Sequence, residues 1–156
     1  MANLEIGDKA PVFTVLDQDG NKVKLTDYKG KKVILYCYPA ASSPGCTKEA
    51  WDFNHNLASL KKGGYEVLGI SPDSVDKIKK FHANQKLKFT LLSDEDLTVH
   101  KAYGSYGLKK LYGREYQGVL RSTFVIDEKG KIALALYNVK ATNHVNMLKK
   151  LLGLAE

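Results

Sequence analysis

Nearly continuous apolar runs alternate along the chain with stretches whose apolar residues have helical spacing. Such runs are typical of strands buried on both faces of a central parallel sheet, and the stretches between them of crossover helices. The glycine- and tyrosine-rich segment 104–118 shows neither pattern, and we expect an irregular loop there. We expect strands over residues 11–16, 23–25, 33–38, 65–70, 89–92, 121–126 and 132–137, and helices over 44–62, 74–85, 96–103 and 142–152.

The order of these elements predicts an α/β fold with a mixed central sheet flanked by helices. Parallel crossovers come first, and an antiparallel hairpin with its turn at Glu128–Lys131 comes last. The chain has 156 residues, close to the usual size of one domain. Because no internal repeat and no linker rich in proline, glycine or serine interrupts it, we expect a single domain over residues 1–156.

One expected helix follows the strand over residues 33–38, which Pro39 ends. Ser43 is a suitable N-cap, and Pro44 is a suitable first helical residue. Cys46 then lies in the first turn, on the same face as Ala50 and the apolar residues that follow at helical spacing. The sulfur is therefore expected to point toward the body of the protein, at the start of the helix.

Two interpretations of Cys46 remain open on spacing alone: an inert buried cysteine and a reactive thiolate. A free thiol with a pKa of about 8.5 is mostly protonated at neutral pH, so reactivity requires help. Unpaired N–H groups and the helix dipole favour an anion in the first turn. Arg121 begins a later strand and is a candidate cation, and the Ser43 hydroxyl lies three residues before the sulfur.

Composition narrows the remaining function classes. The net charge is +7, but the lysine pairs are scattered and no nucleic-acid motif is present, so a solvated basic surface is expected. No apolar stretch is long enough to span a bilayer, and the first residues do not resemble a signal peptide, which favours the cytoplasm. The four histidines lack metal-ligand spacing and are expected at surface or boundary positions, so we expect no metal site.

Pro39-x-x-x-Ser43-x-x-Cys46 resembles the active-site motif of the peroxiredoxin family, and Arg121 matches the family's downstream arginine. Segments around Pro11, Gly30, Ser71-Pro-Asp73 and Asp94 extend the similarity over nearly the whole chain, toward the bacterioferritin-comigratory (PrxQ) subgroup. The resemblance implies a thioredoxin-like fold and reduction of hydrogen peroxide and organic hydroperoxides without a cofactor. A sulfenic acid would form on Cys46.

The resemblance also implies roles for the neighbouring residues. Pro39 would shield the sulfur, Ser43 and Arg121 would hydrogen-bond the sulfur and the peroxide oxygens, and Glu49 would orient the arginine. The protein would be a monomer or a weak dimer.

Trp51 and His100 stand where members of the subgroup carry a resolving cysteine, so this chain resembles a one-cysteine enzyme. The only other cysteine, Cys37, is expected to pack in the core. An external thiol such as thioredoxin, glutaredoxin or glutathione would then reduce the sulfenic acid. An alternative is a peroxide sensor that passes the oxidation to a partner thiol, and a weaker one is a basic surface that binds nucleic acid or unfolded chains.

Overall fold

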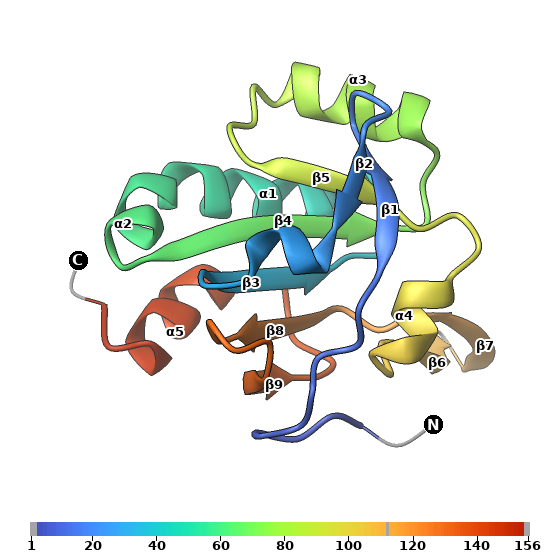
Figure 1. Cartoon of the computed structure of the whole chain (residues 1–156). Helices are drawn as coiled ribbons and strands as arrows, with labels where there is room; N and C mark the ends of the chain where they lie inside the picture. Colours follow the sequence, from blue (N-terminus) through green and yellow to red (C-terminus); the bar gives the residue numbers. More distant parts are fainter. Residues whose placement is uncertain (1–2, 112, 155–156) are drawn as a thin grey trace.

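A seven-stranded mixed sheet forms the centre of the computed structural model, which describes residues 3–111 and 113–154 (Figure 1). A separate hairpin contains two further strands. The strands are β1 (Thr14–Asp17), β2 (Lys22–Lys24), β3 (Lys32–Cys37), β4 (Tyr65–Ser71), β5 (Thr90–Ser93), β6 (Tyr106–Leu111), β7 (Arg114–Val119), β8 (Ser122–Ile126) and β9 (Ile132–Leu136). The helices are η1 (Leu25–Tyr28), α1 (Pro44–His55), α2 (Leu57–Lys62), α3 (Val75–Asn84), α4 (Thr98–Ala102) and α5 (His144–Leu151).

The strand order in the sheet is β2-β1-β5-β4-β3-β8-β9. β3 pairs in parallel with β4, and β4 with β5, through the crossovers that carry α1, α2 and α3. β8 then pairs antiparallel with β3, and β9 with β8. The predicted α/β fold, with parallel crossovers first and an antiparallel hairpin last, is confirmed.

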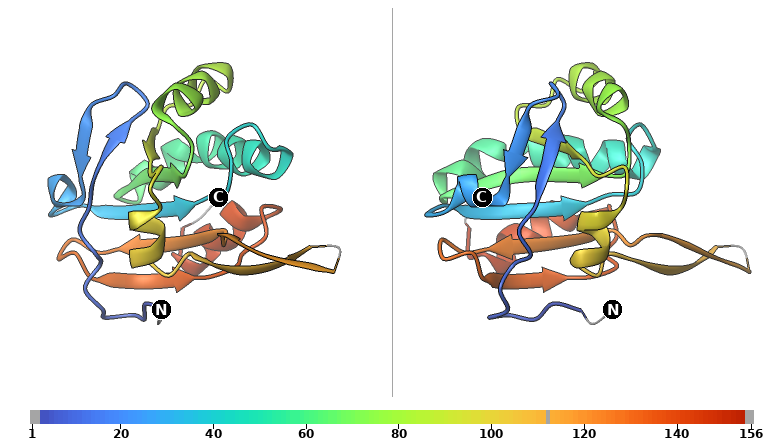
Figure 2. Two further views of the ribbon diagram at one scale, coloured as in Figure 1. Left: turned by 90° about the vertical axis from the view of Figure 1, so that its right-hand side faces the viewer. Right: turned by 45° about the vertical axis from the view of Figure 1, so that its right-hand side comes forward.

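Two apolar clusters pack on opposite faces of the sheet because successive side chains of a strand point to opposite sides. One cluster contains Phe53 of α1, Phe81 of α3 and Leu148 of α5. The other contains Leu25 of η1 and Val99 of α4, together with the segment before β1. Figures 1 and 2 show the helices that cover the sheet on its two sides. Within the described ranges, no helix is long and apolar enough to cross a membrane.

The pairing of β3 with β8 places the start of β8 beside the end of β3. Ser122 pairs with Cys37, so Arg121 lies next to the loop that leads from β3 into α1. Val139 also donates its backbone N–H to the Arg121 carbonyl, over 2.8 Å. Arg121 therefore directly precedes a strand that pairs with the strand before Cys46.

The helix expected over 44–62 is in fact two helices. Asn56 separates α1 from α2. Its side-chain amide donates to the Asp52 carbonyl, in the last turn of α1, over 2.8 Å. Side chains of this type compete with backbone groups and so favour a break. The last helix also begins later than expected: its N-cap is Asn143, at φ 62°, rather than Thr142. Asparagine tolerates this left-handed conformation better than threonine.

The prediction of an irregular loop over 104–118 is wrong. This segment forms the β6–β7 hairpin, which projects from the body of the protein (Figure 2). Tyr112 falls outside the described residues. Leu108 and Tyr116 are exposed, and Lys109 lies over the Tyr116 ring at 5.8 Å. A hairpin with water on both faces has no alternation of buried and exposed positions, which removes the sequence signal for strands.

Gly69→Ala is expected to lower the free energy of unfolding by about 1–3 kcal/mol because it overpacks the core. A Cβ at Gly69 would lie 2.9 Å from the Tyr36 ring and 3.0 Å from Leu91. Tyr36 has little room to move, since its ring stacks on Phe53 with centroids 4.4 Å apart. Urea unfolding measures the effect.

Gly107→Ala is the matched control for this substitution. Gly107 also lies in a strand, but the nearest atom to its added Cβ would be Leu120 at 3.6 Å, an ordinary contact. We expect its unfolding free energy to change by less than about 0.5 kcal/mol. Equal unfolding free energies of the two variants would contradict this prediction and show that the Tyr36 ring moves aside at little cost.

Candidate functional site

Cys46 is the third residue of α1, and its side chain is almost completely buried. Ser43 is the N-cap in an extended conformation, and Pro44 is the first helical residue, as the sequence predicts. The first intrahelical bond runs from the Thr47 N–H to the Ser43 carbonyl, so the N–H groups of Gly45 and Cys46 precede it. These groups and the helix dipole create a positive potential at the sulfur.

The Arg121 guanidinium joins Cys46 to Glu49. Nη2 donates to Cys46 Sγ over 3.3 Å, and Nη1 donates to Glu49 Oε1 over 2.5 Å. Gly45 permits this approach, because a Cβ there would lie 3.3 Å from Nη2. The three residues come from the start of α1 and the residue before β8, and they place a fixed positive charge beside a buried sulfur. Such a charge stabilises negative charge that develops there during a reaction.

Burial raises the pKa of Glu49 to about 7, although the Arg121 charge and hydrogen bond act in the opposite direction. Oε2 of Glu49 is buried and has no hydrogen-bond partner among the described residues. The pKa of Arg121 is raised, since Glu49 and Cys46 outweigh the effect of burial. His144, buried nearby, has its pKa lowered to about 4 by burial and by the Arg121 charge. It is therefore neutral at pH 7, which leaves Arg121 as the cation.

The raised pKa of Glu49 makes the stability of the fold depend on pH. Between pH 4.5 and about 7 the unfolded chain has released the Glu49 proton, while the folded chain retains it. The folded state then binds more protons, so the Glu49 contribution to the unfolding free energy falls as pH rises. Since each pKa unit corresponds to about 1.4 kcal/mol, the decrease is about 3 kcal/mol at most.

We expect Glu49→Gln to remove this pH dependence. Urea unfolding of both proteins between pH 4.5 and 7.5 should show the wild-type chain losing stability relative to the variant across this window. Titration of the other groups is shared by the two proteins and cancels in the comparison. Parallel curves would contradict the assignment and would place the ionisation of Glu49 outside the window.

The loop between β3 and α1 contains Pro39 and Ser43. Ser43 Oγ donates to the Ala40 carbonyl over 3.0 Å and does not bond the sulfur, contrary to one expectation from the sequence. Pro39 is half-buried and lies two residues after the end of β3. The structure thus brings Arg121 to Cys46 by a direct contact and Glu49 to Arg121 by another. It places Ser43 at the helix start with its hydroxyl proton directed to the loop backbone.

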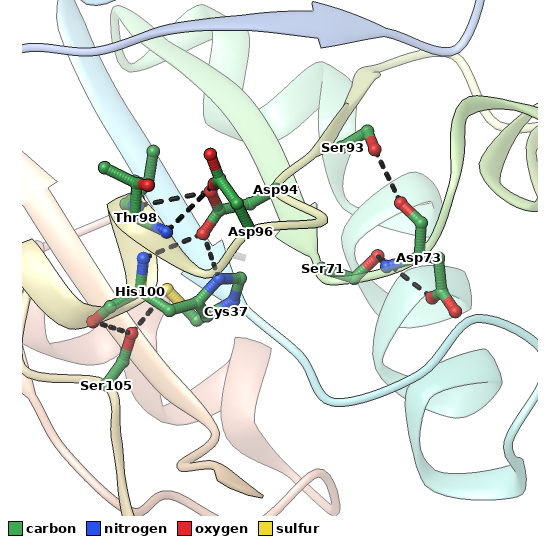
Figure 3. A network of polar contacts seen from close by, with 10 residues as sticks. Cys37, Ser71, Asp73, Ser93, Asp94, Asp96, Thr98, His100 and Ser105 are labelled. Carbon is green, nitrogen blue, oxygen red and sulfur yellow. Dashed lines mark hydrogen bonds and ion pairs between the residues drawn. The ribbon is translucent and has the colours of Figure 1, made fainter.

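Cys37 lies in β3 with its side chain fully buried in the cluster opposite to that of Cys46. Its sulfur accepts a hydrogen bond from Ser105 Oγ over 3.4 Å (Figure 3). Burial raises the pKa of this thiol to about 12, with a smaller opposing effect of Ser105. The expected core position of Cys37 is confirmed, and the sheet separates its side chain from Cys46.

The prediction that the histidines occupy surface or boundary positions is wrong for His100 and His144, which are both buried. His100 Nδ1 lies 2.6 Å from Asp94 Oδ2 (Figure 3). Burial favours a raised pKa for Asp94, but hydrogen bonds from His100 and Val99 outweigh it and lower the pKa. His100 belongs to α4, on the face of the sheet opposite to α1, so the structure does not bring position 100 to Cys46.

Trp51 lies on the outer side of α1, half exposed. Its ring stacks on His55 with centroids 4.8 Å apart, and Lys48 lies over it at 4.9 Å. These side chains line a surface cavity of about 440 Å³ between α1 and the start of α5. In the part of the chain that the structure describes, no group of three histidine, cysteine, aspartate or glutamate residues is placed to hold a metal ion.

Comparisons with known proteins show which family the chain is similar to. The sequence pattern of the AhpC/TSA family matches residues 6–135. Peroxiredoxin Bcp of Escherichia coli is 44% identical over 154 residues, covering 96% of this chain and 99% of its own. A relative from Mycobacterium tuberculosis that bears a peroxiredoxin name is 57% identical over 144 residues, covering 92% of each chain.

Two solved structures are similar over 98% of both chains. A cysteine-to-serine mutant of PrxQ from Xylella fastidiosa superposes with a TM-score of 0.91 at 30% identity. The Xanthomonas campestris bacterioferritin comigratory protein, studied for its alkyl peroxide reduction activity, gives 0.87 at 32% identity. The chain therefore belongs to the AhpC/TSA family of thiol-dependent peroxidases, and within it to the peroxiredoxins of the Bcp/PrxQ kind.

Proposed function

We propose that Cys46 is the peroxidatic residue and that its thiolate attacks the terminal oxygen of a hydroperoxide. The O–O bond breaks, the sulfur becomes a sulfenic acid, and the leaving oxygen takes up a proton to give water or an alcohol. One observation supports this most directly: the Arg121 guanidinium contacts both the Cys46 sulfur and Glu49 at the start of a helix. A fixed cation there stabilises the thiolate and the charge that develops on the peroxide.

The neighbouring residues act on this step in different ways. Arg121 donates to the sulfur and, when peroxide is present, to the leaving oxygen. Glu49 orients Arg121 through their hydrogen bond. Pro39 shields the sulfur from water, and Ser43 binds the peroxide. Two arrangements support these last roles: the loop from β3 holds Pro39, and Ser43 is the N-cap of the helix that carries the sulfur.

We propose that an external thiol reduces the sulfenic acid of Cys46. Cys37 faces the opposite cluster, so a disulfide between the two cysteines would require the sheet to open. Thioredoxin, glutaredoxin and glutathione are the candidate reductants. This chemistry requires a reducing compartment, and we propose that it occurs in the cytoplasm, in a monomer or weak dimer whose single thioredoxin-like domain spans residues 1–156.

The test is a single-turnover experiment followed by recycling. Reduced protein is mixed with one equivalent of hydrogen peroxide or cumene hydroperoxide, and Trp51 fluorescence is followed in a stopped-flow instrument. Because Trp51 lies on the same helix as Cys46, we expect its fluorescence to change, and with peroxide in excess the rate of this change should be proportional to the peroxide concentration. Mass spectrometry after dimedone treatment should find one adduct on Cys46 and none on Cys37. A Cys37–Cys46 disulfide would contradict external resolution.

The sensor alternative differs in how the sulfenic acid is consumed. Repeated fast turnover with glutathione or a thioredoxin system would support the peroxidase cycle. A single oxidation that small thiols and these systems reverse only slowly, while a mixed disulfide with a specific partner protein accumulates, would favour the sensor.

A further inference from the structure

The segment that follows β4 approaches the loop between β3 and α1 through Asp73. Asp73 Oδ2 accepts the backbone N–H of Ala41 over 2.6 Å and the hydroxyl of Ser71 over 3.0 Å. Ser93, at the end of β5, donates its hydroxyl to the Asp73 carbonyl over 2.6 Å (Figure 3). The aspartate is thus fixed by the ends of two central strands, and its carboxylate reaches the loop that contains Pro39 and Ser43.

The peptide group between residues 40 and 41 forms hydrogen bonds with both Asp73 and Ser43. Its N–H belongs to Ala41 and donates to Asp73, while its C=O belongs to Ala40 and accepts from Ser43 Oγ over 3.0 Å. A peptide group is planar, and its N–H and C=O point in opposite directions. Any rotation that breaks the Asp73 contact therefore also moves the acceptor of the Ser43 hydroxyl.

The loop needs such an external support because part of its backbone is strained. Ser42 has φ 68°, in the left-handed region that residues other than glycine rarely adopt. Conformations of this kind persist where the surrounding contacts determine them. Asp73 supplies a charged acceptor for the neighbouring peptide, and hydrogen bonds with a charged partner are stronger than neutral ones.

We propose that Asp73 is a positioning residue of the peroxidase site, and that it acts through the 40–41 peptide on Ser43. With its proton directed to the Ala40 carbonyl, the Ser43 oxygen keeps its lone pairs as acceptors for the O–H of a bound hydroperoxide. Loss of Asp73 frees the peptide, and the Ser43 hydroxyl then loses its fixed direction. This inference rests on the proposed function, because it requires peroxide to bind beside Ser43 and Cys46.

A double-mutant cycle tests the coupling. We expect Asp73→Ala and Ser43→Ala each to lower the second-order rate constant for hydrogen peroxide by about tenfold, the size expected for one hydrogen bond in the transition state. In the Ser43→Ala background, Asp73→Ala should lower this rate constant by less than about twofold, because the effects of substitutions in residues that act as one unit do not add. Asp73→Asn keeps an acceptor oxygen and should retain activity within about threefold of wild type.

A second readout separates positioning from general damage. Alkylation of Cys46 by iodoacetamide needs the thiolate but no oriented peroxide, so we expect it to change by less than about twofold in all these variants. Asp76→Ala is the matched control: it removes the same charge from an exposed position three residues away and should leave both rates unchanged. If Asp73→Ala does not fold, Ser71→Ala, which removes the hydroxyl that orients the carboxylate, takes its place in the cycle.

The possible outcomes distinguish this inference from the proposed function. If the wild-type chain consumes no peroxide, or consumes it without Cys46, the proposed function fails and the inference fails with it. If the wild type is active but the two substitutions multiply to about a hundredfold loss, Asp73 acts independently of Ser43 and the inference alone is overturned. Equal losses in the peroxide and iodoacetamide rates would also overturn it.

Discussion

Cys46→Ser is expected to lower the rate constant for peroxide reduction by about a thousandfold or more, because a serine hydroxyl is barely ionised at neutral pH. The Arg121 guanidinium and the start of α1 would remain, but both act on a charge that the hydroxyl does not carry. The replacement is nearly isosteric, so we expect the fold to be retained. Peroxide consumption in the presence of a thiol reductant measures the loss.

Cys37→Ala is the matched control for this prediction. It removes the only other cysteine sulfur, from the opposite face of the sheet, together with the hydrogen bond from Ser105. We expect the unfolding free energy to fall by about 1 kcal/mol because a buried atom is lost, and the peroxide rate to stay within about twofold. Activity that survives Cys46→Ser but not Cys37→Ala would contradict the assignment of the reactive thiol.

The sequence predicts those parts of the fold that carry a clear apolar pattern: strands buried on both faces are continuous apolar runs, and amphipathic helices are apolar on one side. The apolar runs of β3 and β4 and the amphipathic helix α3 carry such a pattern and lie where expected. The β6–β7 hairpin carries none, because water reaches both of its faces. The breaks near Asn56 and Asn143 depend on side-chain hydrogen bonding and on backbone conformation, which periodicity does not report.

The sequence indicates some residues of the candidate site and not others. Cys46, Ser43 and Pro39 are close in sequence, and their spacing alone indicates a helix start with a thiol. Arg121 is remote: its place at the start of a later strand makes it a candidate, and the resemblance to a family supports that choice. The register of β3 against β8 gives the physical reason for its place. Asp73 lies in a segment that carries this resemblance but had no predicted role, since its contact with the backbone of Ala41 leaves no trace in residue spacing.

Arg121→Ala is expected to impair both activity and stability. The sulfur loses its cationic donor, and we expect the peroxide rate to fall by about a hundredfold to a thousandfold, as for the loss of other transition-state donors. Glu49 loses its partner while fully buried, which costs about 3–5 kcal/mol unless the carboxyl takes up a proton. Since burial already raises the pKa of Glu49, removal of the cation should raise it further.

A second substitution separates these two effects. In the double variant Arg121→Ala/Glu49→Gln, no unpaired carboxylate is buried at position 49. Urea unfolding at pH 8 should therefore show that most of the unfolding free energy lost in Arg121→Ala is restored. The peroxide rate should stay low, because no cation faces Cys46. Arg121→Lys keeps the charge but lacks the two-pronged geometry that joins Sγ to Oε1, so its rate should lie between those of Arg121→Ala and wild type. If the double variant recovered peroxide reduction together with stability, Arg121 would be acting on the fold rather than on the reacting sulfur.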